Sequence, residues 1–335
     1  MDSPFFNNGQ GRKDVKSKKN LVKTLAGKNE IGTLLPLLLM CILVTAVNPA
    51  FIAFDNIMDI FRTSSFYLIV GAPLTLLLLT ADMDLSIGAV TALGGVVCVY
   101  AMKSGLPMGL AIVLGLLAGA AVGLFKAYVI VDLELPALIV TLGIQYAVNG
   151  IVSVTTQGMS VSGATEGFKI LGQYKIFGKV HLTVIFALLI AAVFQVLISR
   201  TKYGRSIFAI GGNPETARLA GIPVKKRRKE VHVLVSVFAA MVGIFMASRF
   251  NSAQTTAGSG TELTVMAAVI IGGTSMYGGS GSVLGSVLGC ILLAVISNGL
   301  VLMKVPSFWQ NLIFGIILLV SVGIDKYRQK INSAA

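Results

Sequence analysis

The chain alternates between long apolar segments and shorter polar ones over most of its length. A helix that crosses the hydrocarbon core of a membrane needs about 20 residues. Runs of about that length recur in this sequence at about 31–50, 66–80, 87–102, 108–125, 136–155, 182–199, 231–250, 263–276, 283–303 and 308–324. The pattern therefore predicts an all-α, polytopic membrane helix bundle with about ten transmembrane helices. Three segments are short, and we expect them to be broken, tilted or re-entrant: 66–80, 87–102 and 263–276.

Composition supports this class. Of the 335 residues, 55% are hydrophobic and only 12% are charged, whereas a soluble domain carries about 25% charged residues. The three cysteines lie in apolar segments, the two histidines lie far apart, and no spacing among them supports a metal site. We expect a multi-pass membrane protein without a metal.

Basic residues gather outside the apolar segments and give a net charge of +13. With ten spans and the N-terminus inside, the positive-inside rule places three basic stretches in the cytoplasm: the tail at 1–30, the loop at 200–229 and the tail at 326–335. It also places Lys126 in a cytoplasmic loop. Anionic lipid and topology explain this charge better than nucleic acid does, so we expect a lipid membrane as partner and no nucleic acid.

The polar stretch 200–229 predicts a short helix between basic flanks. Asn213 is a good N-cap, Pro214 fits the first helical position, and Glu215 suits the first turn, where the helix dipole favours negative charge. Gly221 can adopt the left-handed conformation that ends a helix. Because so short a helix is unstable alone in water, it must pack on its own membrane domain or in the groove of a partner.

Two polar interruptions sit beside short apolar segments. The first, 80–88, contains Asp82 and Asp84, and the second, 272–281, is rich in glycine. Parity places both near the cytoplasmic face, where the carboxylates can be solvated, and we favour helix capping by Asp84 or Ser86 over contact with a substrate. Even so, paired short and Gly-broken segments in a transporter point toward its pathway.

Within the apolar segments the polar side chains are mostly neutral, and we find no charge near the middle of a span. This disfavours an ion-coupled carrier and suits a path for a neutral solute. Hydrogen bonding between helices remains an alternative for each residue. Glycines at intervals of four, at 115–123 and 281–289, indicate close helix packing, within one subunit in preference to between subunits. The residues we assign to a possible substrate path are Gln145, Asn149 and Asn298.

Enzyme signatures are absent from the sequence. The chain has no G-x-x-x-x-G-K-[ST] motif, so it is no P-loop ATPase, and it has neither H-E-x-x-H nor G-x-S-x-G. We therefore expect no catalytic residues.

Three motifs in order resemble those of one family. D-L-S-I-G occupies 84–88, A-I-G-G-N-P-E-T-A-R-L-A-G-I occupies 209–222, and E-L at 262–263 precedes A-A-V-I-I-G-G-T-S at 267–275. The chain resembles the permease subunits of bacterial ATP-binding-cassette (ABC) importers for monosaccharides such as ribose, galactose and xylose, a branch of a family that includes branched-chain amino acid permeases. The resemblance covers 31–327. Asp82, Thr216 and Thr264 depart from its pattern.

The resemblance implies a type II-like ABC importer permease with its transmembrane domain at 31–325. The loop at 200–229 would be the cytoplasmic coupling loop that docks on a separate ATPase. Its coupling residues would be Gly212, Asn213, Pro214, Glu215, Ala217, Arg218, Leu219 and Gly221. Residues of the pathway or its gate would be Asp84, Ser86, Gly88, Glu262, Gly272, Gly273 and Thr274.

The resemblance also implies partners. ATP and Mg would bind the partner ATPase, with no cofactor on this chain. An extracytoplasmic binding protein would deliver the sugar, and a second permease chain would complete the path in the bacterial cytoplasmic (inner) membrane, with both termini cytoplasmic. A pentose or hexose leads among substrates, while a nucleoside or autoinducer-type sugar stays open. The alternatives are an ATP-independent secondary carrier or channel, or a polytopic membrane enzyme.

Overall fold

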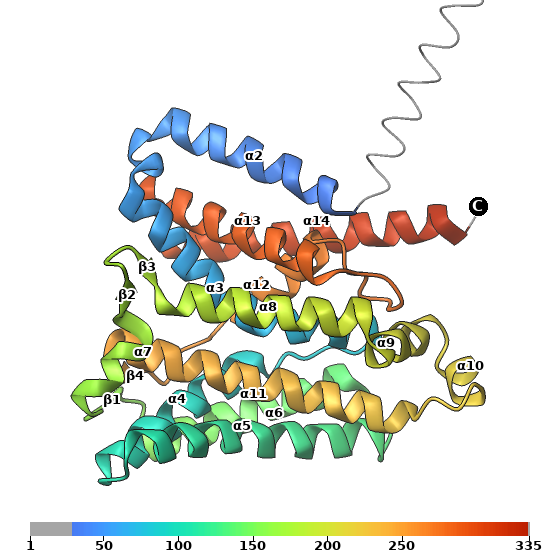
Figure 1. Ribbon diagram of the computed structural model, residues 1–335, viewed down its shortest axis with the longest axis horizontal. Coiled ribbons are helices and arrows are strands. Elements are labelled where there is room, and N and C mark those ends of the chain that lie inside the picture. The colour runs from blue at the N-terminus through green and yellow to red at the C-terminus, as the bar shows by residue number, and fades with distance from the viewer. Residues whose placement is uncertain (1–28, 334–335) are drawn as a thin grey trace, which may run out of the picture.

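The apolar segments fold into helices that lie roughly along one axis of the molecule (Figure 1). The computed structural model describes residues 29–333, so the tail predicted at 1–30 falls almost wholly outside the described residues. Six of the helices described are long and apolar enough to cross a membrane: α3 (Phe54–Leu79), α5 (Met108–Val131), α6 (Ala137–Thr156), α8 (Leu182–Arg200), α11 (Val224–Phe250) and α13 (Val283–Leu302).

Four further helices carry shorter apolar stretches. They are α2 (Asn29–Val47), α4 (Ile87–Lys103), α12 (Thr261–Ile271) and α14 (Ser307–Ser333). Each apolar segment of the sequence therefore contains one helix, and α14 extends past the domain boundary predicted at 325. The segment at 66–80 was wrongly predicted to be short. Its helix begins at Phe54, because polar residues such as Asp55 and Arg62 interrupt the apolar pattern without ending the helix.

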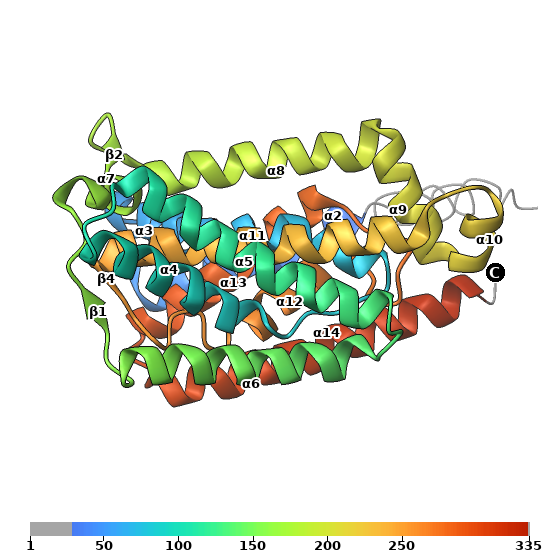
Figure 2. The same cartoon turned by 90° about the horizontal axis from the view of Figure 1, so that it is seen from below.

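The remaining elements lie at the two ends of the bundle. One end carries α7 (Lys169–Gln173) and the short strands, and the opposite end carries α9 (Lys202–Gly212), α10 (Pro214–Leu219) and the C-terminus (Figures 1 and 2). Strand β1 (Val161–Ser162) pairs antiparallel with β4 (Ser252–Ala253), and β2 (Lys175–Ile176) pairs antiparallel with β3 (Val180–His181). Two 3₁₀ turns complete the set: η1 (Pro49–Ile52) and η2 (Glu166–Phe168).

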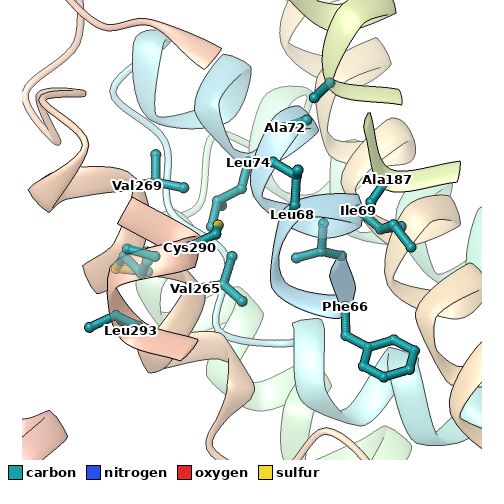
Figure 3. Close-up of a cluster of buried hydrophobic side chains, with 14 of the residues drawn as sticks. Phe66, Leu68, Ile69, Ala72, Leu74, Ala187, Val265, Val269, Cys290 and Leu293 are labelled. Atoms are coloured by element: carbon teal, nitrogen blue, oxygen red, sulfur yellow. The ribbon is translucent and has the colours of Figure 1, made fainter. Parts of the chain in front are cut away.

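The main apolar core lies where α3 meets α8, α12 and α13 (Figure 3). The second half of α3 is buried on all sides, which explains why it is apolar all round. In contrast, α5, α6 and α8 expose large apolar side chains such as Leu117, Ile139 and Leu189. Contiguous apolar exposure of this kind marks a surface that lipid or another chain covers.

Helix α11 packs against both α4 and α5. Glycines allow this close approach, because a methyl group on Gly119 would lie 2.6 Å from the Ala240 Cβ and 2.8 Å from the Ser236 carbonyl oxygen. The second stripe packs Gly285 against Gly272 and Gly289 against Ala268. Both stripes are therefore packing faces within the chain, as the sequence favoured.

We predict that Gly119→Ala destabilises the protein by about 1–3 kcal/mol, because the added methyl group overpacks the α5–α11 contact. The matched control is Gly143→Ala on α6, where a methyl group would meet nothing within 4 Å. The measurement is the midpoint of thermal unfolding of each variant in detergent. Equal midpoints for the two variants would contradict the close contact.

Candidate functional site

The segment of residues 81–88 joins α3 to α4 and brings the predicted motifs together. It leaves α3 through Ala81, whose φ of 61° lies in the left-handed region. Most of its side chains are buried, including Asp82, Asp84 and Ser86. The expectation that the two carboxylates are solvated is therefore wrong, since each of them is enclosed by other helices.

At the start of this segment, the end of α3, the last turn of α9 and the glycine-rich turn at 278–279 meet. The Gly279 N–H donates to the Leu79 carbonyl at the end of α3, 3.0 Å away. Gly211 of α9 lies between these two residues, where any side chain would collide with the Leu79 carbonyl oxygen. Gly278, with φ of 87°, packs on the Gly211 backbone, and its added methyl group would lie 3.1 Å from the Ala81 Cβ. The last turn of α9, directly before α10, thus touches both polar interruptions of the sequence.

Asp82 is held by two side chains of α11. Arg228 donates to both carboxylate oxygens, with Nη2 2.7 Å from Oδ1 and Nε 2.8 Å from Oδ2. The His232 Nε2 lies 3.4 Å from Oδ2. A bidentate arginine–carboxylate pair fixes geometry as well as charge, so Asp82 anchors the segment to α11.

Asp84 forms a fully buried ion pair with Lys126 of α5. The Lys126 Nζ also donates to Ser236 Oγ at 2.8 Å and to Ser86 Oγ at 3.3 Å. Lys126 is therefore not in a loop, as the topology argument had it, but inside α5 with no exposed surface. Buried charges require such pairing, because an uncompensated ion in a low-dielectric interior is very costly.

The prediction that Asp84 or Ser86 caps α4 is wrong. Ser86 stands at the N-cap position of α4, but its side chain accepts no cap hydrogen bond there. Its backbone N–H and its hydroxyl instead donate to Asp84 Oδ1, at 2.8 and 2.6 Å. Asp84 thus shapes the turn before α4 while it neutralises Lys126.

Glu262 lies against Gly88, so α4 and α12 begin beside each other. A side chain on Gly88 would collide with Glu262 Oε2 and with the Gly258 carbonyl oxygen. Both residues occupy the first turn of their helices, where the positive end of the helix dipole favours a carboxylate. Glu262 Oε1 accepts from Gln145 Nε2 of α6 at 3.1 Å, while the buried Oε2 has no hydrogen-bond partner in the described part of the chain.

The structure does not gather all predicted pathway residues. Glu262 lies in the first turn of α12, whereas the opposite end of this helix is followed by Gly272, Gly273 and the buried Thr274. Asn298 lies apart as well, since its amide exchanges hydrogen bonds of 2.8 and 3.1 Å with Asn56 of α3. Asn149 is exposed on α6, one turn beyond Gln145. Their place on a substrate path stays a prediction.

The short helix predicted from capping chemistry is confirmed as α10. Asn213 Oδ1 accepts from the Thr216 N–H at 2.9 Å, Pro214 occupies the first turn, and Gly221 is left-handed with φ of 80°. Sequence reasoning missed helix α9 before it, which ends at Gly212. Ala217 is the one buried residue of α10, whereas Leu219 is 78% exposed. Helix α10 therefore presents an apolar side chain to the outside.

Glu215 and Arg218 form an exposed pair along α10, with Oε1 2.5 Å from Nη2. The hydrogen bond from Arg218 lowers the pKa of Glu215, so this carboxylate stays charged at neutral pH. A groove of about 510 Å³ lies beside the pair, between α10, the start of α11 and the turn that joins α5 to α6. It carries both signs of charge, including Glu134 and Lys225. This is a surface on which a complementary protein segment can dock.

Sequence reasoning missed four residues of the site: Lys126, Arg228, His232 and Ser236. Only Lys126 gave a usable indication, because its charge directly follows an apolar run. Pairing it with Asp84 required the packing of α5 against the 81–88 segment, which no local pattern encodes.

Comparison with known proteins identifies relatives of the whole chain. Residues 56–322 match the family described as branched-chain amino acid transport system / permease component. The chain is 33% identical to the ribose import permease protein RbsC of Bacillus subtilis over 89% of its length and 92% of that protein. It is 33% identical to RbsC of Escherichia coli K12 over 91% of its length and 96% of that protein.

A further relative differs in its cargo. The chain is 30% identical to the autoinducer 2 import system permease protein LsrC of an Enterobacter strain, over 91% of its length and 88% of that protein. No solved structure matches the chain.

We predict that Lys126→Met destabilises the protein by about 3–5 kcal/mol, because it leaves Asp84 as an unpaired buried charge. Lys225→Gln is the matched control, since it breaks the exposed pair with Glu134 and should cost at most about 1 kcal/mol. Thermal unfolding in detergent measures both. The double variant Asp84→Asn with Lys126→Met should recover part of the loss, and no recovery would contradict the assignment of the cost to the charge.

Proposed function

Because this chain belongs to the ABC importer permease-component family that its matches define, we propose that it forms the translocation path for a monosaccharide. As a permease component it is a multi-pass transport subunit without catalytic activity of its own. Its similarity to ribose import permeases over nearly the full length supports a pentose or related sugar. Its similarity to an autoinducer 2 permease keeps an autoinducer-type sugar open as the alternative substrate.

Helix α10 supports the proposal that a separate ATPase drives transport. Helices this short are unstable alone, yet α10 holds an exposed leucine and an exposed ion pair beside a groove. In our proposal the ATPase binds ATP and Mg and grips α10, and α9 carries the movement to the Gly211 junction. From there the 81–88 segment leads to its last residue, Gly88, which lies against Glu262. The observation that carries this mechanism is the contact of Gly211 with Leu79 and Gly279.

Helix α6 supports a path completed by a second permease chain. Gln145, Asn149 and Ser153 follow one another at intervals of four and form a polar stripe along the helix. Asn149 and Ser153 are exposed on the single chain. Polar side chains at membrane depth usually face a bundle interior or a water-filled cavity. We therefore place the sugar between two chains, along this stripe and toward Glu262.

Orientation follows from charge. The end that carries α9, α10 and the basic start of α11 would face the cytoplasm of a bacterium, together with both termini. The opposite end, with its short strands and α7, would receive the sugar from an extracytoplasmic binding protein. The chain would then reside in the inner membrane.

One observation favours a second candidate, an ATP-independent carrier. Such a carrier needs ionisable residues at membrane depth, and Glu262 and Lys126 are ionisable side chains buried in helices, although each lies toward the end of its helix and not near the middle. Lys126 is neutralised by Asp84, which leaves Glu262 as the only one of the two without an ionic partner. Uptake by the purified chain alone, in vesicles without ATP, would establish the carrier and exclude the importer.

One prediction of the proposed function concerns α10. Replacing residues 213–220 with a Gly/Ser linker should abolish both copurification of an ABC ATPase and ATP-dependent uptake, since it removes the docking helix but spares Gly211. Gentle extraction of the tagged chain and identification of its partners measures the first effect. A charge swap, Glu215→Arg with Arg218→Glu, is the matched control for the ion pair: it keeps the pair within α10 but reverses it toward a partner. Full uptake by the swap would remove these two residues from the docking role.

Another prediction of the proposed function concerns the polar stripe of α6. Asn149→Leu should lower sugar uptake about ten-fold, the effect of about 1.4 kcal/mol lost when a polar group on the path goes unsatisfied. Val154→Leu, at an exposed apolar position of the same helix, should leave uptake unchanged. Radiolabelled ribose uptake at equal membrane abundance measures both. Equal uptake by the two variants would remove α6 from the path.

A further inference from the structure

A groove of about 920 Å³ opens at the α9 end of the bundle, separate from α10 and from the 81–88 segment. Its floor is apolar and comes from three helices, with Leu124 of α5, Leu197 of α8, and Val233 and Leu234 of α11. Its rim is mainly basic and comes from the first two turns of α11, which also contribute the carboxylate of Glu230, together with Tyr203 of α9. In Figure 2 this region lies where α8 and α11 approach α9. An apolar floor beneath a cationic rim matches a molecule with an acyl chain and an anionic head.

The rim concentrates positive charge at an unfavourable place. Lys225, Lys226, Arg227 and Lys229 occupy the start of α11, and the first turn contains no acidic residue. The N-terminal end of a helix is already the positive end of its dipole, so cations there raise the energy of the helix. A bound anion would relieve both this repulsion and the repulsion among the four side chains.

The carboxylates of the chain compensate this charge only in part. Lys225 pairs with Glu134 at 3.0 Å, Arg227 with Glu230 at 2.8 Å, and Lys229 with Asp132 at 2.5 Å. Lys226 is exposed and has no ion pair within the described residues. One rim cation is therefore left for an external anion.

Two donors beside the rim also lack acceptors. The guanidinium of Arg227 lies over the Tyr203 ring, 4.7 Å from its centroid. The Arg227 Nε and the Tyr203 hydroxyl are both buried without a hydrogen-bond partner in the part of the chain that is described. Buried donors are normally satisfied. A phosphate seated at the rim, or water bound with it, would supply oxygen atoms here.

We propose that this groove binds one anionic phospholipid, with its phosphate at Lys226 and Arg227 and an acyl chain along Leu124, Leu197 and Val233. Basic pockets between transmembrane helices on the cytoplasmic side suit such headgroups, whereas a zwitterionic lipid gains little from them. This site is independent of the transported solute and of the pathway, so it holds for an importer subunit and for a carrier alike.

Native mass spectrometry of the purified, delipidated full-length chain tests the proposal. Dioleoyl phosphatidylglycerol and dioleoyl phosphatidylcholine are titrated in turn, so that only the headgroup differs. The phosphatidylglycerol should bind at least about five-fold more tightly than the phosphatidylcholine. Lys226→Gln should lower the affinity for phosphatidylglycerol by about that factor, which is the contribution of one cation near an anionic lipid. Lys226→Arg should retain binding. Lys179→Gln, which removes an exposed cation in the β2–β3 turn at the opposite end, should also retain binding.

Four results would overturn the proposal. Equal affinity for the two lipids would exclude headgroup recognition, and unchanged affinity in Lys226→Gln would exclude the rim. Displacement of the lipid by equimolar glycerol phosphate would show that the apolar floor contributes nothing. Loss of a copurifying ATPase in Lys226→Gln, without any lipid preference in the unaltered chain, would assign the rim to a protein partner.

Discussion

The buried ion pair between Asp84 and Lys126 constrains the rest of the structure. Two charges without exposed surface persist inside a membrane bundle only when each compensates the other and hydrogen bonds satisfy what remains. Ser86 and Ser236 provide those bonds. The pair therefore fixes the non-helical segment between α3 and α4 against α5 and α11. Non-helical backbone at this depth is tolerated only when protein encloses it, and the pair keeps it enclosed.

This constraint places the start of α4 beside the start of α12. Once the segment is fixed, Gly88 lies under Glu262, and the absence of a side chain at Gly88 lets the carboxylate approach two helix N-termini. The other end of the segment touches Gly211 and Gly278, next to the loop that carries α10. A displacement of α10 thus has a continuous packed route to Glu262. Variants of α10 measure the energetic coupling that this packed route carries.

Sequence patterns predicted the features that depend on local chemistry. Hydropathy located every apolar helix within residues 29–333, and the residues Asn213, Pro214 and Gly221 predicted α10 because each satisfies a specific backbone requirement. Patterns failed where distant segments decide the outcome. Nothing local distinguishes a solvated Asp82 from one held by Arg228, 146 positions away in the sequence. The hydropathy pattern likewise made α3 too short, because exposed polar residues such as Asp55 and Asp59 interrupt the apolar pattern without ending the helix.

The exposed polar stripe of α6 indicates what the single chain lacks. Asn149 and Ser153 face outward beside large apolar side chains such as Tyr146 and Val154. Lipid covers the apolar residues at no cost but cannot satisfy an amide, so the stripe needs water or another polar surface. A pathway enclosed within one chain would have turned these groups inward. Their outward position, with Gln145 donating to Glu262, supports our proposal that a second chain joins the first to form the path.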